Sequence, residues 1–295
     1  MITKVLVTGG NGQVGQNLQK YAQDFNVQIT ACGSKDLDIT CAESIRIAIS
    51  RVRPDVIINA AAYTAVDKAE SDKEKAYLVN ETGPKLLAQA CDGQNIPLFH
   101  ISTDYVFDGS QDAPYNEFDP VNPQTIYGAS KEAGERAVRS NLQKHIILRT
   151  SWVFSAEGNN FVKTMIKLAN ERDQISVVND QFGGPTSADS IAYVLLKMAS
   201  KKDLEWGTYH FSQLPYVSWY EFAVSIFKEA QLLGILDKQI EIVPIPTILY
   251  PTAAKRPQQS SLAVSTIIRD VAPSFEDKNW FPDLQKVLSN LKVIS

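Results

Sequence analysis

Short apolar runs alternate with amphipathic stretches through the first half of the chain. The apolar runs are rich in β-branched side chains, which is typical of strands buried on both faces of a parallel sheet. We predict strands at residues 4–8, 27–32, 55–59, 98–101 and 145–148. Helices are predicted from the turn after the first strand to residue 21, and over 72–91 and 126–141. The alternation indicates an α/β protein with a Rossmann-type doubly wound parallel sheet.

The alternation loosens after residue 150, where glycine and proline interrupt the pattern. Helices are predicted there at 160–172, 188–200, 218–233 and 283–291, and strands at 175–178 and 240–245. We expect this part of the chain to build a smaller C-terminal lobe over the ends of the strands. The cleft between the two lobes is the expected ligand site.

A glycine-rich turn, Gly9-Gly10-Asn11-Gly12-Gln13-Val14-Gly15, follows the first strand. Its glycines are spaced Gly9-x-x-Gly12-x-x-Gly15, unlike the commoner G-x-G-x-x-G. Glycine permits a tight turn and lets a pyrophosphate approach the backbone, where the first N–H groups of a helix face the anion. Because the turn joins a strand to a helix, it favours dinucleotide binding over a plain tight turn.

We therefore assign residues 1–150 to a dinucleotide-binding Rossmann domain. Residues 151–295 are assigned mainly to a substrate-binding lobe. Within that second part, residues 158–176 and 186–212 are expected to return to the first domain.

Small and polar side chains follow three of the predicted strands, at the edge where open α/β sheets bind ligands. Ala60-Ala61-Ala62 would let a ligand approach the backbone, although tight packing explains them equally well. Ser102-Thr103-Asp104-Tyr105 bring hydroxyls that are candidates to hold a carbonyl oxygen. Arg149-Thr150-Ser151-Trp152 follow the fifth strand.

The second strand ends in Cys32-Gly33-Ser34-Lys35, without an acidic residue. An NAD-specific site often places a carboxylate here on the ribose 2′-hydroxyl. Its absence predicts that a 2′-phosphate is tolerated, so NADPH is the expected cofactor and NADH is also accepted. Asp38 comes later and could meet the adenine edge or cap the next helix.

Tyr127 and Lys131 are four residues apart in the stretch predicted to be a helix, so both side chains lie on one helix face. A free phenol has a pKa near 10, and a nearby ammonium lowers it. A phenol tuned in this way can donate a proton to a carbonyl oxygen as hydride reaches the carbon. On its own the Tyr-x-x-x-Lys pattern is short, and a surface tyrosine beside a solvated lysine would also produce it.

Composition excludes several classes of partner. The 295 residues carry a net charge of −4, which gives no electrostatic reason to expect nucleic acid or an anionic membrane. Three cysteines lack a C-x-x-C spacing and three histidines lie far apart, so no disulfide framework and no metal site are predicted. The sequence has no signal-like or membrane-spanning run, and we expect a cytoplasmic protein.

Six motifs in order along nearly the whole chain resemble the dTDP-4-dehydrorhamnose reductases, a branch of the extended short-chain dehydrogenases/reductases. They are residues 56–70 (VIINAAAYTAVDKAE), 102–107 (STDYVF), 149–153 (RTSWV), 158–161 (GNNF), 180–186 (DQFGGPT) and Arg256-Pro257. The resemblance implies NAD(P)H-dependent reduction of the 4-keto group of dTDP-4-dehydro-L-rhamnose, the last step of dTDP-L-rhamnose synthesis for cell-surface polysaccharides.

The resemblance also implies roles for single residues. Thr103 and Tyr127 would bind the keto oxygen, Tyr127 would donate the proton, and Lys131 would lower the phenol pKa and hold the nicotinamide ribose. Together with the glycine turn it implies these dinucleotide contacts: Gly9, Asn11, Gly12, Gln13, Val14, Gly15, Asp38, Ile39, Ala60, Ala61 and Ala62. The implied substrate contacts are Asp104 and Trp152, with Asn160, Gln181 and Arg256 as candidates for the diphosphate or for stabilising loops.

Nucleotide-sugar 4,6-dehydratases are similar but carry Thr-Asp-Glu; this chain has Tyr105 at the third position and so lacks the base expected for elimination. Another nucleotide-sugar reductase or an epimerase remains an alternative, although epimerases tend to have Ser-Ser or Ser-Ala before this position. A non-catalytic, NADP-binding regulatory subunit of the same fold would bind a partner enzyme without turning over a sugar. The sequence leaves a homodimer, the cofactor preference in the cell and metal-assisted assembly open.

Overall fold

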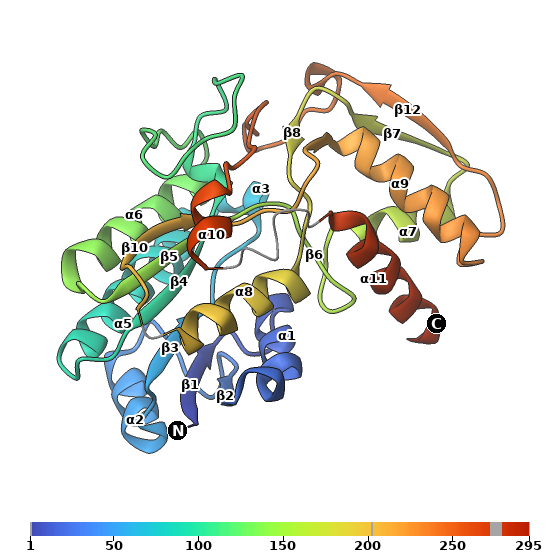
Figure 1. The fold of residues 1–295 in the computed structure, drawn as a ribbon. Helices are drawn as coiled ribbons and strands as arrows, with labels where there is room; N and C mark the ends of the chain where they lie inside the picture. The colour runs from blue at the N-terminus through green and yellow to red at the C-terminus, as the bar shows by residue number, and fades with distance from the viewer. Residues whose placement is uncertain (1, 202, 272–278, 295) are drawn as a thin grey trace.

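The computed structural model of the protein describes residues 2–201, 203–271 and 279–294 (Figure 1). Its centre is a sheet of six parallel strands in the order β10-β5-β4-β3-β1-β2. The strands are β1 (Thr3–Thr8), β2 (Val27–Cys32), β3 (Val56–Asn59), β4 (Leu98–Thr103), β5 (His145–Thr150) and β10 (Gly207–His210). The chain moves from β1 outward to β2 and then returns to the other side of β1. Doubly wound sheets bind ligands at such a reversal, beyond the carboxyl ends of the strands.

The strands are apolar because both faces of the sheet are covered. Val5 and Val7 point into one core, which is shared with α1 (Gln13–Tyr21) and α8 (Ala188–Ser200). Leu6, between them, points into a second core on the opposite face. The helices of that second face are α2 (Ala42–Val52), α5 (Gly83–Asp92) and α6 (Ile126–Asn141). The expected Rossmann-type sheet is confirmed.

The stretch predicted as one helix over residues 72–91 is divided in the structure. It forms α4 (Lys73–Tyr77), a π-helical segment (Leu78–Thr82) and α5. Asn80 lies in the π-helical segment, and its amide binds both the N–H and the carbonyl of Tyr63 and also the Ser130 hydroxyl. π-Helical turns often occur near functional sites. This one ties the segment after β3 to α6.

The second lobe has its own apolar core, between helices and a two-stranded parallel sheet. Its elements are α7 (Phe161–Glu171), β7 (Gln174–Val178), α9 (Trp219–Leu232), β12 (Glu241–Ile245) and α11 (Trp280–Ile294). We expected residues 158–176 to return to the first domain. Of this range, α7 and β7 pack in the second core, whereas Gly158 and Asn160 lie against Gln13 of the first domain. Residues 188–210 do lie with the first sheet, through α8 and β10.

The remaining elements are short. They are α3 (Val66–Ala69), β6 (Val153–Phe154), β8 (Phe182–Gly183), β9 (Thr186–Ser187), β11 (Val217–Ser218), α10 (Ser265–Asp270), and short helical turns at Ala22–Phe25, Asp104–Val106 and Thr247–Leu249. Figure 1 shows α11 lying beside α8, at the side of the molecule that carries the second lobe. Within the described residues, no helix is long and apolar enough to cross a membrane.

The contact between α11 and the first lobe is ionic and polar. Lys286 on α11 pairs with Asp189 on α8 at 2.6 Å, and Asp189 also accepts a hydrogen bond from Tyr21 on α1. Asp283, one turn earlier on α11, accepts hydrogen bonds from Ser187 and Ser190, both at 2.6 Å. The last helix therefore fixes the second lobe to the helices that cover the sheet.

Candidate active site

A cavity of about 890 Å³ lies at the carboxyl ends of β1, β3 and β4, with the second lobe above it. Its lining combines the glycine turn, the alanine triplet after β3, the end of β4, the first turn of α6 and Trp219 of the second lobe. The strand ends meet here because all six strands of the sheet run in the same direction.

The glycines of the turn have no side chains, so the backbone itself lines the cavity or packs closely against neighbouring backbone. Gly9 has a φ of +70°, and a Cβ there would lie 2.6 Å from the carbonyl carbon of Ala60. A Cβ on Gly15 would lie 2.3 Å from the Gly9 carbonyl oxygen, so Gly15 serves the packing of α1 on the turn and does not line the cavity. Helix α1 begins after Gly12 without a side-chain cap, and Gln13 and Val14 line the cavity. The first N–H groups of this helix are therefore free to face an anion.

The remaining predicted dinucleotide contacts also line the cavity: Asn11, Asp38, Ile39, Ala60, Ala61 and Ala62. Asp38 does not cap α2, whose N-cap is Cys41 without a side-chain hydrogen bond, and contact with the adenine edge stays a prediction. Its carboxylate accepts hydrogen bonds from the N–H and the hydroxyl of Thr40, which hold the loop before α2, and it still faces the cavity.

Close packing at the start of α6 brings Tyr127 to the end of β4. Thr125 caps the helix through a hydrogen bond from the N–H of Gly128. A Cβ on Gly128 would lie 2.2 Å from the carbonyl oxygen of Tyr105, so glycine allows the helix to touch the turn after β4. The Tyr127 phenol lies close enough to the Thr103 hydroxyl to influence its pKa, and both side chains line the cavity. The two side chains that the resemblance assigns to the keto oxygen therefore lie at one site.

The pKa of Tyr127 differs from our expectation. We expected Lys131 to lower it, whereas burial raises the pKa of Tyr127 to about 12, with the nearby Asp104 acting in the same direction and the nearby Thr103 hydroxyl against it. The ring keeps part of its surface open to the cavity. The phenol is therefore fully protonated at neutral pH, as a proton donor must be before the reaction.

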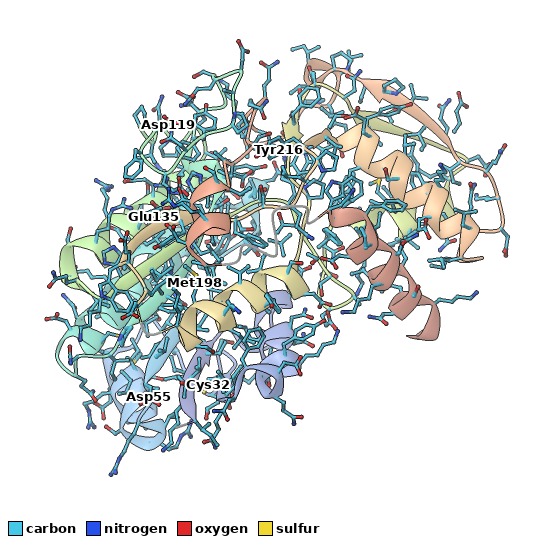
Figure 2. The ribbon with its side chains drawn as sticks, viewed as in Figure 1. Cys32, Asp55, Asp119, Glu135, Met198 and Tyr216 are labelled. Carbon is cyan, nitrogen blue, oxygen red and sulfur yellow. The ribbon has the colours of Figure 1, made fainter. Side chains whose placement is uncertain are left out.

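Lys131 lies one turn further along α6, and its side chain is 2% exposed. Its ammonium donates a hydrogen bond of 2.7 Å to the carbonyl of Ile101. Burial lowers the pKa of Lys131 to about 8, and Glu135, one more turn along, acts against that shift. Glu135 is itself held by Arg149 at 2.7 Å, and Figure 2 labels it on α6 beside the central sheet. Lys131 thus stays cationic at neutral pH.

Two tryptophans form the wall of the cavity on the side of the second lobe. The rings of Trp152 and Trp219 stack with centroids 3.4 Å apart, and both line the cavity. Trp152 has a φ of +46°, which is uncommon for a residue with a side chain. Gly183 leaves room for its indole, since a Cβ there would lie 2.6 Å from the ring. Ser218 and Glu221 form a capping box that starts α9 at Trp219.

Three candidates for the diphosphate lie outside the lining of the cavity and have partners of their own. Asn160 donates to Gln13 Oε1 and to the Ser155 carbonyl, and its own oxygen caps α7. Gln181 donates to the Thr247 hydroxyl at 3.0 Å. For these two side chains the geometry favours the loop-stabilising alternative.

Arg256 is the third of these candidates. Its guanidinium binds both carboxylate oxygens of Asp67, at 3.2 and 2.6 Å. Asp67 lies in α3, after β3, whereas Arg256 follows β12, so this ion pair joins the two lobes. The expected contact with a diphosphate stays a prediction for Arg256.

The tip of β2 carries an acidic side chain that sequence reasoning missed. Asp36 folds back in a turn, and its carboxylate accepts a hydrogen bond of 3.2 Å from the N–H of Gly33. Gly33 and Ser34 line the cavity, whereas the exposed Lys35 and Asp36 do not. We considered only residues 32–35 in the sequence, because nothing there signals the turn that returns Asp36 to the strand end.

Trp219 was also missed, since a single aromatic residue at a helix start carries no signal of a ligand site. Ser102, Lys75 and Ser151 are among the other polar residues of the lining. No cluster of three or more histidine, cysteine, aspartate or glutamate side chains suited to a metal ion occurs among the described residues.

The doubly wound sheet, its glycine turn and the tyrosine–lysine pair at one cavity place the protein among the extended short-chain dehydrogenases/reductases. The family model described as RmlD substrate binding domain matches residues 3–293. A dTDP-4-dehydrorhamnose reductase of Aggregatibacter actinomycetemcomitans is 43% identical over 296 residues, covering 99% of both chains. The chain belongs to the dTDP-4-dehydrorhamnose reductase family.

Other relatives agree. The dTDP-4-dehydrorhamnose reductase of Escherichia coli strain K12 is 39% identical, covering 97% of both chains. The crystal structure of the dTDP-4-dehydrorhamnose reductase of Bacillus anthracis strain Ames, in complex with NADP, aligns with a TM-score of 0.89 at 37% identity, covering all of both chains.

Proposed function

We propose that the protein reduces the 4-keto group of dTDP-4-dehydro-L-rhamnose to give dTDP-L-rhamnose, with NADPH as cofactor. The placement of Tyr127, Thr103 and Lys131 together in the cavity that also holds the glycine turn carries this proposal. Membership of the reductase family supports it.

The residues at the cavity suit a dinucleotide. The uncapped start of α1 offers N–H groups to a pyrophosphate, and Gly9 keeps the backbone clear where a Cβ would collide with Ala60. When bound, NADPH would supply the hydride. The related structure that contains NADP supports the choice of cofactor.

The chain itself supplies the proton and the position of the carbonyl group. Thr103 and Tyr127 are proposed to hold the keto oxygen by hydrogen bonds. As negative charge develops on that oxygen, Tyr127 donates its proton, which forms the alcohol. Lys131 stays charged at neutral pH and favours the transient phenolate. The Trp152–Trp219 wall is proposed to contact the sugar and to exclude water.

We further propose that residues 1–150, with 188–210, form the dinucleotide-binding domain, and that most of the rest binds substrate. The two packed cores support this division. A cytoplasmic protein is supported by its three free cysteines. A homodimer, and a role in cell-surface polysaccharide synthesis, are the remaining parts of the proposal.

Mixing the purified protein with dTDP-4-dehydro-L-rhamnose and NADPH tests the function. We expect the absorbance of NADPH to fall and dTDP-L-rhamnose to form in equal amount. A non-catalytic regulatory subunit would bind NADPH and leave its absorbance unchanged, so that result would contradict the proposal.

A further inference from the structure

The hydroxyl of Thr103 is the junction of a hydrogen-bond chain in the wall of the cavity. It donates to Asp104 Oδ1 at 3.0 Å and accepts the backbone N–H of Tyr105 at 3.2 Å. The phenol of Tyr127 lies beside it in the same cavity. A hydroxyl has a single proton to donate. While Asp104 is ionised it takes that proton, and Thr103 cannot also donate to a keto oxygen.

The surroundings of Asp104 oppose its ionised form. The side chain is 2% exposed, and Oδ2 is buried without a hydrogen-bond partner among the described residues. The groups that face it are the phenols of Tyr105 and Tyr127 and the hydroxyl of Ser260, none of which is cationic. The nearest cations are engaged elsewhere, Lys131 by the Ile101 carbonyl and Arg256 by Asp67.

Burial is the largest influence on this carboxyl group. It raises the pKa of Asp104 from 3.8 to about 6, although the nearby Ser260 and Thr103 hydroxyls and two backbone N–H groups act against it. A buried carboxylate without a cation is costly, so the neutral acid is favoured until the pH passes that value.

We propose that Asp104, in its protonated form, frees the Thr103 hydroxyl for the keto oxygen and returns a proton to Tyr127 through Thr103. This inference rests on the proposed reduction. Protonated Asp104 donates to Thr103 Oγ, so the Thr103 proton turns toward the cavity. Asp104 acts through Thr103 and is therefore a positioning residue.

The proton transfers balance. Hydride from NADPH reduces the carbonyl carbon, and the Tyr127 O–H bond breaks as the product O–H bond forms. The Thr103 proton then passes to the phenolate, and the Asp104 proton passes to Thr103. The carboxylate that remains takes a proton from solvent before the next turnover.

The pH dependence of turnover tests this inference. For wild type we expect kcat to fall by about tenfold per pH unit once the pH exceeds the pKa of Asp104. Asp104→Asn keeps the shape of the side chain but does not titrate, so we expect a lower kcat that lacks this fall. Asp92→Asn changes the same charge at the exposed end of α5 and should retain the wild-type profile.

Thermal unfolding gives a second readout that needs no turnover. Because the native pKa of Asp104 lies above 3.8, wild type loses stability as pH rises from about 4 to 6 and then levels off. We expect the Tm of Asp104→Asn to rise relative to wild type over that interval. Loss of the Lys131 charge gives a separate fall above its pKa of about 8 in both proteins. An active wild type whose fall between about pH 6 and 8 persists in Asp104→Asn, or a Tm difference that is independent of pH, overturns the inference. A wild type that oxidises no NADPH at any pH overturns the proposed reduction as well.

Discussion

Tyr127 has the environment of an acid that must hold its proton until charge develops next to it. Burial keeps the phenol neutral, and the Thr103 hydroxyl lies beside it in the cavity. Tyr127→Phe preserves the ring and removes the proton. We expect kcat to fall on the order of 10²-fold or more, in the range for loss of general acid catalysis, while NADPH binding is largely kept. Turnover with NADPH and binding of NADPH by fluorescence measure the two effects.

Lys131→Met is the matched comparison, because it removes a buried cation from the same helix face. It should lose turnover and cofactor affinity together. Near-normal turnover in Tyr127→Phe would show that another group supplies the proton.

From the charges at the tip of β2 we predict only a small preference between NADPH and NADH. The exposed Lys35 attracts a 2′-phosphate, whereas Asp36, also exposed and bonded to Gly33, repels it. Each effect is about 1 kcal/mol or less at an exposed position. We expect NADPH to be used at least as well as NADH, and Lys35→Glu to invert the order. The ratio of kcat/KM for the two cofactors measures this preference.

Asp36→Asn is the control in the opposite direction, because it removes a negative charge where Lys35→Glu adds one. It should shift the kcat/KM ratio in favour of NADPH. If wild type strongly prefers NADH, or if neither substitution changes the ratio, the 2′ position is recognised by other residues.

Local sequence predicted some contacts of single residues and missed others for a physical reason. Tyr127 and Lys131 were predictable because helix geometry alone fixes their relation. Asp36 and Trp219 were not, since their places depend on a turn and on the packing of the second lobe. The pKa of Tyr127 was misjudged because burial exceeds any effect of Lys131, whose ammonium is bonded to a carbonyl.

At the scale of elements, the ion pair between Asp67 and Arg256 joins the segment after β3 to the segment after β12. The two side chains are 44% and 23% exposed, so the pair contributes about 1 kcal/mol or less. We expect Arg256→Ala to raise KM for the nucleotide sugar several-fold and to change kcat little, because the residue is proposed to hold the lobes and not to react. Steady-state kinetics with varied sugar concentration test this.

Asp67→Ala separates two explanations for that effect. If the ion pair acts by holding the lobes together, both substitutions raise KM alike. If the guanidinium instead binds the diphosphate directly, KM rises in Arg256→Ala alone. If KM and kcat are unchanged in both variants, the ion pair does not contribute to substrate binding.

Most elements were predictable because periodicity reports burial, and the β-branched runs of the first half all form strands, of which the edge strand β2 is only partly buried. Two exceptions depend on long-range packing. The π-helical segment around Asn80 arises where an amide must reach Tyr63 and Ser130, which a helical pattern does not show. The sequence did not show that α7 and β7 pack in the second core, because an amphipathic pattern indicates burial without indicating the lobe in which an element is buried.

At the scale of the whole molecule, the first lobe is incomplete without later segments of the chain. β10 pairs with β5 in the sheet, and α8 packs against α1 with buried residues such as Ile191 and Leu195. A fragment of residues 1–150 would expose the edge of β5 and the apolar face that α8 covers. We expect this fragment to aggregate, whereas residues 1–212 should yield more soluble protein. Gel filtration and circular dichroism of both fragments test this, and a monomeric, folded 1–150 would contradict it.

The late position of β10 has a consequence for synthesis of the chain on the ribosome. The first five strands of the sheet have been synthesised when the chain reaches Thr150. The sixth strand, Gly207–His210, follows only after α7 and β7 of the second lobe have been synthesised. At roughly 5–20 residues per second, the edge of β5 stays unpaired for several seconds during translation. We expect chaperones to bind a nascent chain with this unpaired strand edge. Slow codons between residues 150 and 210 would lengthen the time for which the edge of β5 is exposed.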